Sequence, residues 1–172
     1  MRGVRLNLLG VADLSIFGGA DWKRLYGWMA DLGWHLEVQC EGERFASLLS
    51  VLRDLPVALV IDHFGLPDPG ISDPYAGVAA ILQAAKKQAL YVKLSAPYRL
   101  RGADPKKYAS LYLAELGADW LLWGSDWPWT NHERGRTYEE CLGMLRDWTR
   151  SMDAQCTILQ DTPKRLYGFG EE

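Results

Sequence analysis

Short apolar stretches rich in β-branched residues alternate along the chain with longer segments in which apolar residues recur at helical spacing. This alternation is typical of βα units arranged around a parallel sheet. About six stretches are predicted to be strands, at residues 3–9, 35–40, 57–64, 91–94, 120–124 and 157–159. The stretch 57–64 is almost continuously aliphatic, as expected of a strand that is buried on both faces. The pattern therefore predicts an α/β fold with parallel strands.

The segments between these strands have the spacing and the end signals of helices. They cover about residues 21–32, 45–52, 75–88, 105–116 and 137–151, and a closing turn is expected at 162–167. Asp104 followed by Pro105 is typical of a helix start, because the carboxylate can accept a hydrogen bond from a free N–H and proline tolerates the first helical position. A loop rich in Pro, Gly and Asp at 65–73 separates the third strand from its helix.

The number of βα units is too small for a closed (β/α)₈ barrel, which normally takes at least ~200 residues. Met1 and Arg2 also lead directly into a predicted strand, without a preceding helix. We therefore expect residues 1–172 to form a single partial domain of the TIM-barrel type, truncated on its N-terminal side to about six βα units. Such a barrel exposes an unpaired strand edge, through which we expect a homo-oligomer to form.

Composition and charge exclude several classes of protein. The chain has 19 Lys and Arg against 22 Asp and Glu, for a formal net charge of −3, and 48% of its residues are hydrophobic. This balance excludes intrinsic disorder and provides no basic field for nucleic acid or an anionic membrane surface. The longest apolar run, residues 55–61, is far shorter than the ~20 residues of a membrane-spanning helix. Neither nucleic acid nor a membrane is expected as a partner.

The three cysteines, Cys40, Cys141 and Cys156, are widely spaced and odd in number. This spacing argues against a disulfide framework and against a zinc ribbon, and it fits a reducing compartment. The N-terminal residues do not form the apolar core and cleavage site of a signal peptide. We therefore expect a cytoplasmic protein.

In parallel sheets and barrels, reactive side chains lie just past the carboxyl ends of the strands. His63 ends the most apolar predicted strand, where a neutral imidazole can bind a metal, carry a proton or polarise a carbonyl group. A buried structural histidine would give the same pattern. Asp126 precedes the aromatic run 127–129, where a partly desolvated carboxylate with a raised pKa suits a general base. An aspartate that forms a turn or caps a helix is the alternative.

Two arginines are candidates for binding an anionic substrate. Arg99 follows the fourth predicted strand, and its planar guanidinium can bind a carboxylate through two hydrogen bonds, with a plain surface arginine as the alternative. Arg5 interrupts the first strand, and if it points inward it needs an anionic partner or an anionic substrate, because a buried charge cannot stay unpaired. The period of two leaves its direction open. Further candidates for substrate binding near the strand ends are Ser95, Tyr98 and His132, and for His132 a rim residue is the alternative.

Four segments of the chain, in this order and spacing, resemble the amidohydrolase-related family of TIM-barrel hydrolases. They are GVRLN (3–7), VIDHFG (60–65), VKLSAPYR (92–99) and WGSDWP (123–128), and TPKRLYGF (162–169) resembles the C-terminal helix of that family. The chain has no G-x-S-x-G, Walker, G-x-G-x-x-G or H-E-x-x-H motif that would indicate other chemistry. Within the family, the Ser-Ala-Pro-Tyr-Arg segment is most similar to the 2-pyrone-4,6-dicarboxylate lactonase branch.

The resemblance implies roles for individual residues. Asp126 matches the catalytic aspartate that activates the hydrolytic water, and His63 matches a histidine that polarises the scissile carbonyl or binds metal. Arg99 and Arg5 match arginines that hold substrate carboxylates. The implied function is water attack on a carboxylated lactone, or on a related ester or C–C substrate, with a small carboxylated molecule as partner. The alternative is an inactive barrel fragment that acts only through oligomerisation or a partner chain.

The first strand of that family carries a His-x-His pair, and this sequence contains none. His63 and Asp126 supply two ligands, whereas a catalytic zinc site normally has three from the protein. We therefore expect no cofactor and no tightly bound metal in this chain by itself. If a His-x-His pair were supplied in a longer form, His63 and Asp126 would be expected to hold a divalent metal such as zinc. The lactonase branch resembles a metal-independent variant of the family.

Overall fold

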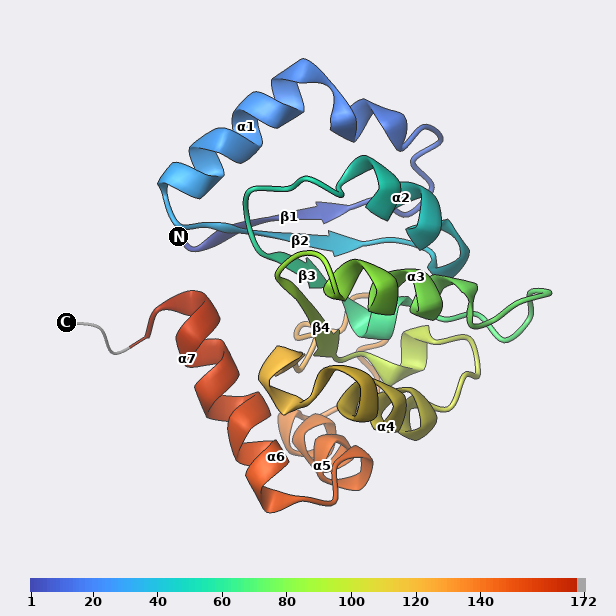
Figure 1. Cartoon of the computed structure of the whole chain (residues 1–172). Coiled ribbons are helices and arrows are strands. Elements are labelled where there is room, and N and C mark those ends of the chain that lie inside the picture. The colour runs from blue at the N-terminus through green and yellow to red at the C-terminus, as the bar shows by residue number, and fades with distance from the viewer. Residues whose placement is uncertain (170–172) are drawn as a thin grey trace.

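The computed structural model describes residues 1–169 and contains one parallel sheet with the strand order β1-β2-β3-β4-β5 (Figure 1). The strands are β1 (Gly3–Asn7), β2 (His35–Gln39), β3 (Leu59–Ile61), β4 (Leu90–Leu94) and β5 (Leu121–Trp123). Each strand pairs in parallel with its predecessor, so every connection advances by one strand. Because right-handed crossovers of this kind place their helices on one face, the other face is left for side chains of the interior. The predicted α/β fold with a parallel sheet is confirmed.

The helices follow the predicted segments closely. They are α1 (Ala20–Asp31), α2 (Phe45–Val51), α3 (Ala76–Ala85), α4 (Pro105–Leu116), α5 (Tyr138–Trp148), α6 (Met152–Cys156) and α7 (Thr162–Tyr167). Asp104 accepts a hydrogen bond from the Lys106 N–H at the start of α4, as its sequence predicts. Thr137 and Glu140 form a reciprocal capping box at the start of α5. Within residues 1–169, no helix is long and apolar enough to cross a membrane.

The two faces of the sheet differ in polarity. The face toward the helices is apolar, and its fully buried strand residues include Leu36, Val38, Leu59, Ile61, Val92 and Leu94. On the opposite face, Val60, Tyr91 and Leu122 form a smaller cluster, against which Leu166 and Tyr167 of the C-terminal helix pack. Charged and polar side chains occupy the rest of that face, toward the carboxyl ends of the strands. The polar site therefore lies between two apolar regions. The main core packs on the opposite face of the sheet, and the smaller cluster lies next to the site on the same face.

The predicted sixth strand at residues 157–159 is wrong. Thr157–Asp161 forms a π-helical segment that joins α6 to α7 in one continuous helical run. Ser151 starts this run by accepting a hydrogen bond from the Ala154 N–H. Ile158 is buried, whereas its neighbour Leu159 is partly exposed, as on one side of a helix. A run of three apolar residues has no period of its own, so its sequence could not separate a strand from a helix.

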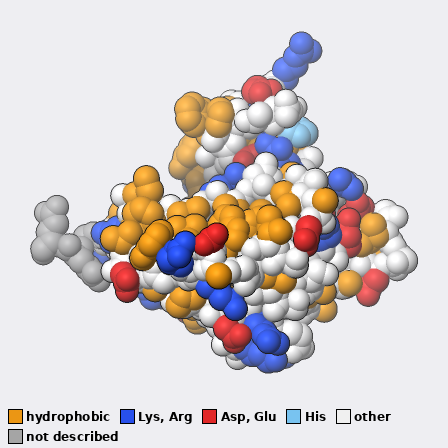
Figure 2. Space-filling view, turned by 90° about the horizontal axis from the view of Figure 1, so that it is seen from above, with side chains coloured by type: hydrophobic (Ala, Val, Ile, Leu, Met, Phe, Trp, Pro, Cys, Tyr) orange, Lys and Arg blue, Asp and Glu red, His pale blue; other side chains and the backbone are white. Residues whose placement is uncertain are grey.

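Both edge strands pair on one side only within residues 1–169, β1 with β2 and β5 with β4. Figure 2 looks onto the molecule from the side of α1 and shows hydrophobic side chains gathered in a band across this face. Ile16, Trp28 and Leu32, which lie before, within and directly after α1, are each at least half exposed. Contiguous exposed apolar surface of this kind is typical of interaction sites. Oligomerisation through the sheet edge stays a prediction.

A buried hydroxyl ties α4 to the turn that follows β3. Tyr112 is fully buried, and its hydroxyl donates to the carbonyl of Phe64 at 2.9 Å. We expect Tyr112→Phe to lower the free energy of unfolding by about 1–3 kcal/mol, because the Phe64 carbonyl is left without its donor. Urea denaturation followed by tryptophan fluorescence measures the loss. Tyr138→Phe, on a ring that is 55% exposed, is the control and should change little. Equal midpoints for the two variants would contradict this account.

Candidate active site

Three consecutive strands are each followed by a residue with a left-handed backbone. These residues are His63 after β3 (φ 50°), Ala96 after β4 (φ 49°) and Asp126 after β5 (φ 59°). A positive φ costs a residue other than glycine roughly 1–2 kcal/mol, and such strain is found mainly at functional sites. The turns bring the side chains that follow β3, β4 and β5 to the same end of the sheet. Sequence analysis identified this end from strand position alone.

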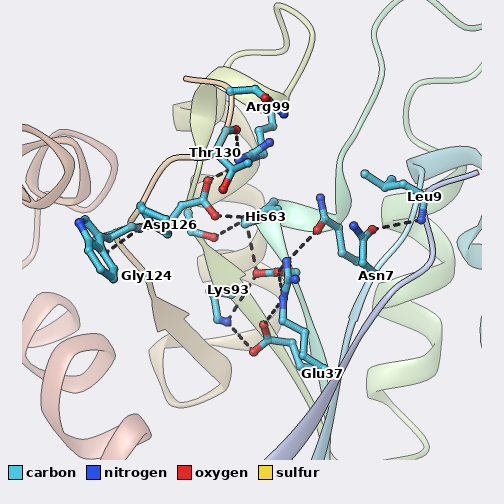
Figure 3. Close-up of a pocket in the computed structure, with 17 residues that line it drawn as sticks. Asn7, Leu9, Glu37, His63, Lys93, Arg99, Gly124, Asp126 and Thr130 are labelled. Atoms are coloured by element: carbon cyan, nitrogen blue, oxygen red, sulfur yellow. Dashed lines mark hydrogen bonds and ion pairs between the residues drawn. The ribbon is translucent and has the colours of Figure 1, made fainter. Parts of the chain in front are cut away.

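A cavity of about 690 Å³ opens at the carboxyl ends of the strands. Figure 3 shows His63 and Asp126 pointing toward one another at its centre, with Arg99 and Thr130 on one side and Lys93 and Glu37 on the other. The lining cations are Arg5, Lys93 and Arg99, and the lining carboxylates are Glu37, Asp62 and Asp126. Three positive charges therefore balance three negative charges around the cavity.

Four of these charges form a closed ring on the inner face of the sheet. Arg5 Nε donates to Glu37 Oε1 at 2.9 Å, and Lys93 Nζ donates to Glu37 Oε2 at 2.5 Å. Lys93 Nζ lies 3.5 Å from Asp62 Oδ1. Asp62 Oδ2 in turn accepts from Nε and Nη2 of Arg5 at 2.9 and 2.5 Å. Opposite charges thus alternate around the ring, so that each buried charge has a partner on both sides.

For Lys93 and Asp62, attraction to the charged partners in the ring outweighs the free-energy cost of burying the charge. Burial opposes the charge of Lys93, but Asp62 and Glu37 raise the pKa of Lys93 above its ordinary value. Burial likewise favours the neutral form of Asp62, but Lys93, His63 and Arg5 hold the pKa of Asp62 below its usual range. Gly124 leaves room for the Lys93 side chain, because a Cβ at residue 124 would lie only 3.1 Å from Lys93 Cδ. Arg5, Asp62 and Lys93 are therefore ionised together at neutral pH.

The ring shows which groups the Arg5 side chain binds. Its side chain points to the inner face, where it meets the anionic partners Glu37 and Asp62 and also donates to Gln39 Oε1 at 2.7 Å. The sequence left open whether Arg5 would face an anionic partner or a substrate, and the partners within the chain already neutralise it. Lys93 and Glu37 are not among the site residues selected from the sequence. The signal was available, because each is a charged residue with apolar neighbours on both sides within its strand.

His63 lies directly above the ring and is 3% exposed. Its Nδ1 is 2.8 Å from Ser95 Oγ and 3.4 Å from Asp62 Oδ1, while its Nε2 is 3.6 Å from Asp126 Oδ1. Burial lowers the pKa of His63; Asp62 and Asp126 oppose this shift, whereas Arg5 and Arg99 add to it. The imidazole is therefore neutral at pH 7. A neutral histidine can present one N–H as a donor and accept at its other nitrogen.

The two oxygens of Asp126 have different surroundings. Oδ2 accepts from the Tyr98 hydroxyl at 2.6 Å and from Arg99 Nε at 2.9 Å. Oδ1 lies on the side of His63. Arg99 Nη2 donates to the carbonyl of Thr130 at 3.0 Å. Within the described part of the chain, Nη1 is then the nitrogen of Arg99 that has no hydrogen bond, so it is the one available to a ligand.

The predicted site residues divide between two cavities. Ser95 and Arg99 line the 690 Å³ cavity together with His63 and Asp126. Tyr98 and His132 instead line a neighbouring cavity of about 300 Å³, where their rings lie 4.8 Å apart. Arg99 lines both cavities. Tyr98 reaches Asp126 through its hydroxyl, whereas His132 is brought to Tyr98 and not to the main cavity.

The donors at this end of the sheet do not fit a catalytic metal. Within residues 1–169, no group of three or more His, Cys, Asp and Glu side chains converges as a metal site would require. Asp62 is neutralised by Arg5 and Lys93, and Asp126 Oδ2 is held by two donors. Protein cations thus stand next to the carboxylates at which a metal ion would be expected. The chemistry of these residues is that of a polar acid–base site.

Comparison with known proteins identifies the family to which this chain is similar. A protein-family model described as Amidohydrolase matches residues 1–169. The 2-pyrone-4,6-dicarboxylate hydrolase of Comamonas testosteroni is 30% identical, over 97% of this chain and 59% of that protein. The chain therefore spans about three fifths of the length of this curated relative.

Two solved structures have the same fold. One, from Pseudomonas putida and named a 2-pyrone-4,6-dicarboxylic acid hydrolase, is 33% identical with a TM-score of 0.87 and matches 100% of this chain and 65% of its own. The other, of the same name and from Acinetobacter baumannii with citric acid bound, is 30% identical with a TM-score of 0.88 over 98% of this chain and 65% of its own. The expected TIM-barrel type of fold is confirmed, and the five strands correspond to part of such a barrel.

The lowered pKa of His63 predicts a loss of stability in acid. Unfolding returns His63 to its ordinary pKa of about 6.5, so below that value the unfolded chain binds more protons than the folded chain. The contribution of the neutral imidazole is complete above about pH 6.5 and is lost as the pH falls toward the folded pKa. We expect the free energy of unfolding to decrease from pH 7 to pH 5, and to decrease less in His63→Gln.

Urea titrations at several pH values measure this dependence. Buried His35, whose pKa burial also lowers, keeps a residual slope in the variant. Identical slopes for the wild type and His63→Gln would show that His63 does not titrate as described.

Removal of one cation tests the charge ring. Lys93→Met leaves Glu37 and Asp62 with Arg5 as their shared cation, and we expect a loss of about 3–5 kcal/mol in the free energy of unfolding. Lys87→Met, at an exposed position next to α3, is the matched control and should be nearly neutral. Chemical denaturation at pH 7 compares the two. A Lys93→Met protein as stable as the control would contradict the ring.

Proposed function

Because the chain belongs to the amidohydrolase family, we propose that its site hydrolyses a carboxylated lactone or a related cyclic ester, with water as the nucleophile. The observation that carries the proposal is the arrangement of Asp126. Two donors hold its Oδ2, while its Oδ1 lies 3.6 Å from His63 Nε2 at the main cavity. A fixed carboxylate with one oxygen left for water is the arrangement that a general base requires. The names of the relatives supply the substrate class.

The first step is attack by water on the lactone carbonyl. Asp126 Oδ1 takes one proton from the water as its oxygen bonds to the carbonyl carbon, and the carbonyl oxygen becomes an oxyanion. For this step we assign the N–H of His63 to Nε2, the nitrogen on the side of Asp126, while Nδ1 accepts from the Ser95 hydroxyl. This N–H donates to the carbonyl oxygen and stabilises the negative charge that develops there.

The second step opens the ring. The oxyanion restores the carbonyl group, the bond from the carbonyl carbon to the ring oxygen breaks, and the leaving oxygen takes the proton held by Asp126. One water is consumed, and the product carries a new carboxyl group and a new hydroxyl or enol group. Asp126 is ionised again at the end of the cycle, as a general base that returns its proton must be.

Recognition of the substrate carboxylate depends on directed donors and not on an excess of positive charge, because the lining charges balance. Arg99 is the candidate, since Asp126 and Thr130 orient its guanidinium and its Nη1 has no partner within residues 1–169. A guanidinium oriented in advance loses little freedom when it binds a carboxylate. The citric acid in the Acinetobacter baumannii structure supports a small carboxylated ligand for this family.

Ring opening of 2-pyrone-4,6-dicarboxylate, followed by the loss of pyrone absorbance, tests the proposal on the full chain. We expect turnover by the wild type and a decrease in kcat of about 10²–10⁴-fold in Asp126→Asn, the contribution of a general base. Circular dichroism should show an unchanged fold. Asp147→Asn, at an exposed position on α5, is the matched control and should keep its activity.

No turnover of any carboxylated lactone by the folded wild type would overturn the proposal. If light scattering also showed an obligate oligomer, that result would favour the inactive barrel fragment as the alternative. Full activity in Asp126→Asn would instead remove Asp126 from the chemistry.

A further inference from the structure

We infer that Tyr98 is a positioning residue that acts through Asp126 and does not bind the substrate. The inference rests on the proposed function, in which Asp126 accepts the proton of water. The hydroxyl of Tyr98 and Nε of Arg99 fix one oxygen of the carboxylate, and the other oxygen is thereby the one presented to water. The position of Tyr98 after the fourth predicted strand instead suggests a residue that binds the substrate.

The contact geometry makes the two oxygens of Asp126 inequivalent. The Tyr98 hydroxyl donates to Oδ2 at 2.6 Å, and Arg99 Nε donates to the same oxygen at 2.9 Å. Hydrogen bonds to an ionised acceptor are short and strong, and rotation of the carboxylate would break both of them at once. Asp126 therefore keeps Oδ1 on the side of His63.

The side from which Tyr98 approaches excludes it from the substrate cavity. Asp126, His63 and Arg99 line the 690 Å³ cavity, and Tyr98 does not. Tyr98 lines the neighbouring 300 Å³ cavity, and its hydroxyl reaches Asp126 from there. To donate to a ligand in the main cavity, the hydroxyl would have to leave the carboxylate.

The ring of Tyr98 is held on its other side as well. The guanidinium carbon of Arg136 lies 3.6 Å from the ring centroid, and the ring of His132 lies 4.8 Å away. Arg136 Nε also donates to the carbonyl of His132 at 2.9 Å, which joins these two contacts. A cation over an aromatic face is attracted to it and restricts the ring. Tyr98 is thus clamped between Asp126 and two residues that take no part in the chemistry.

The protonation state of the phenol agrees with a permanent donor. Burial raises the pKa of Tyr98, and the hydrogen bond to Asp126 and its negative charge raise it further, against the opposing effects of Arg99 and Arg136. The hydroxyl therefore keeps its proton throughout the range in which the enzyme would work. A phenol in this state positions the base without exchanging a proton with it.

Steady-state kinetics of Tyr98→Phe test the inference, because this change removes the hydroxyl and keeps the ring under Arg136. We expect kcat to fall about tenfold, the effect of one lost hydrogen bond to a charged group, while KM changes less than about twofold. Tyr138→Phe, whose ring contacts Trp123, is the matched control and should match the wild type.

The opposite kinetic pattern overturns the inference. A rise in KM with an unchanged kcat would make Tyr98 a substrate contact, and an unchanged Tyr98→Phe enzyme would give it no role.

A second readout needs no activity. In protein labelled with ¹³Cζ-tyrosine, the resonance missing from Tyr98→Phe identifies Tyr98. We expect this resonance to be almost unchanged up to about pH 11 in the wild type and to titrate at lower pH in Asp126→Asn, because the anion that raises the pKa of Tyr98 has been removed. Identical titrations would show that the contact is absent. A chain without lactone hydrolysis would overturn the proposed function, while this experiment would still decide the contact.

Discussion

The pairing of charges inside the sheet is the constraint on which the site depends. Arg5 lies on β1, Glu37 on β2, Asp62 directly after β3 and Lys93 on β4, and each is held between two opposite charges. Glu37, Asp62 and Lys93 are largely buried, and an unpaired charge among them would cost several kcal/mol, whereas the closed ring leaves each of them with a partner. The ring can close only when the four strands lie in their observed register. The same interaction therefore supports the sheet and forms the floor of the cavity.

The charge ring also sets the electrostatic surroundings of the acid–base pair, His63 and Asp126. Because the ring is neutral as a whole, burial decides the state of His63 above it, and the imidazole is neutral. Asp126 is balanced separately by Arg99, and Tyr98 adds a second donor to the same oxygen. The site thus has no excess positive charge, and the orientation of individual donors replaces it as the means to recognise a carboxylate. Such a site uses protein cations next to its carboxylates where a metal ion would otherwise be expected.

Much of the architecture could be predicted from local pattern. The helix at Pro105–Leu116 has the predicted bounds because its start depends on Asp104 and Pro105, which act within a few residues of the chain. His63 and Asp126 were found because a parallel sheet collects the residues that follow its strands at one edge. The segment 157–159 was predicted wrongly as a strand because its three residues have no period of their own. Lys93 was missed because a charge in a strand has meaning only with its partners in view.

Local sequence patterns specify the first five strands and the helices between them, the family resemblance and the two residues at the centre of the site. These features depend on periodicity, end signals and position along a strand, which are properties of neighbouring residues. The folded structure is needed to show that Arg5 faces Glu37 and Asp62, and that Tyr98 approaches Asp126 from a separate cavity. The partners of these side chains are 28 to 57 residues away in the chain. Hydrogen bonds and ion pairs act over a few ångströms in space, and only the folded sheet brings such distant residues within that range.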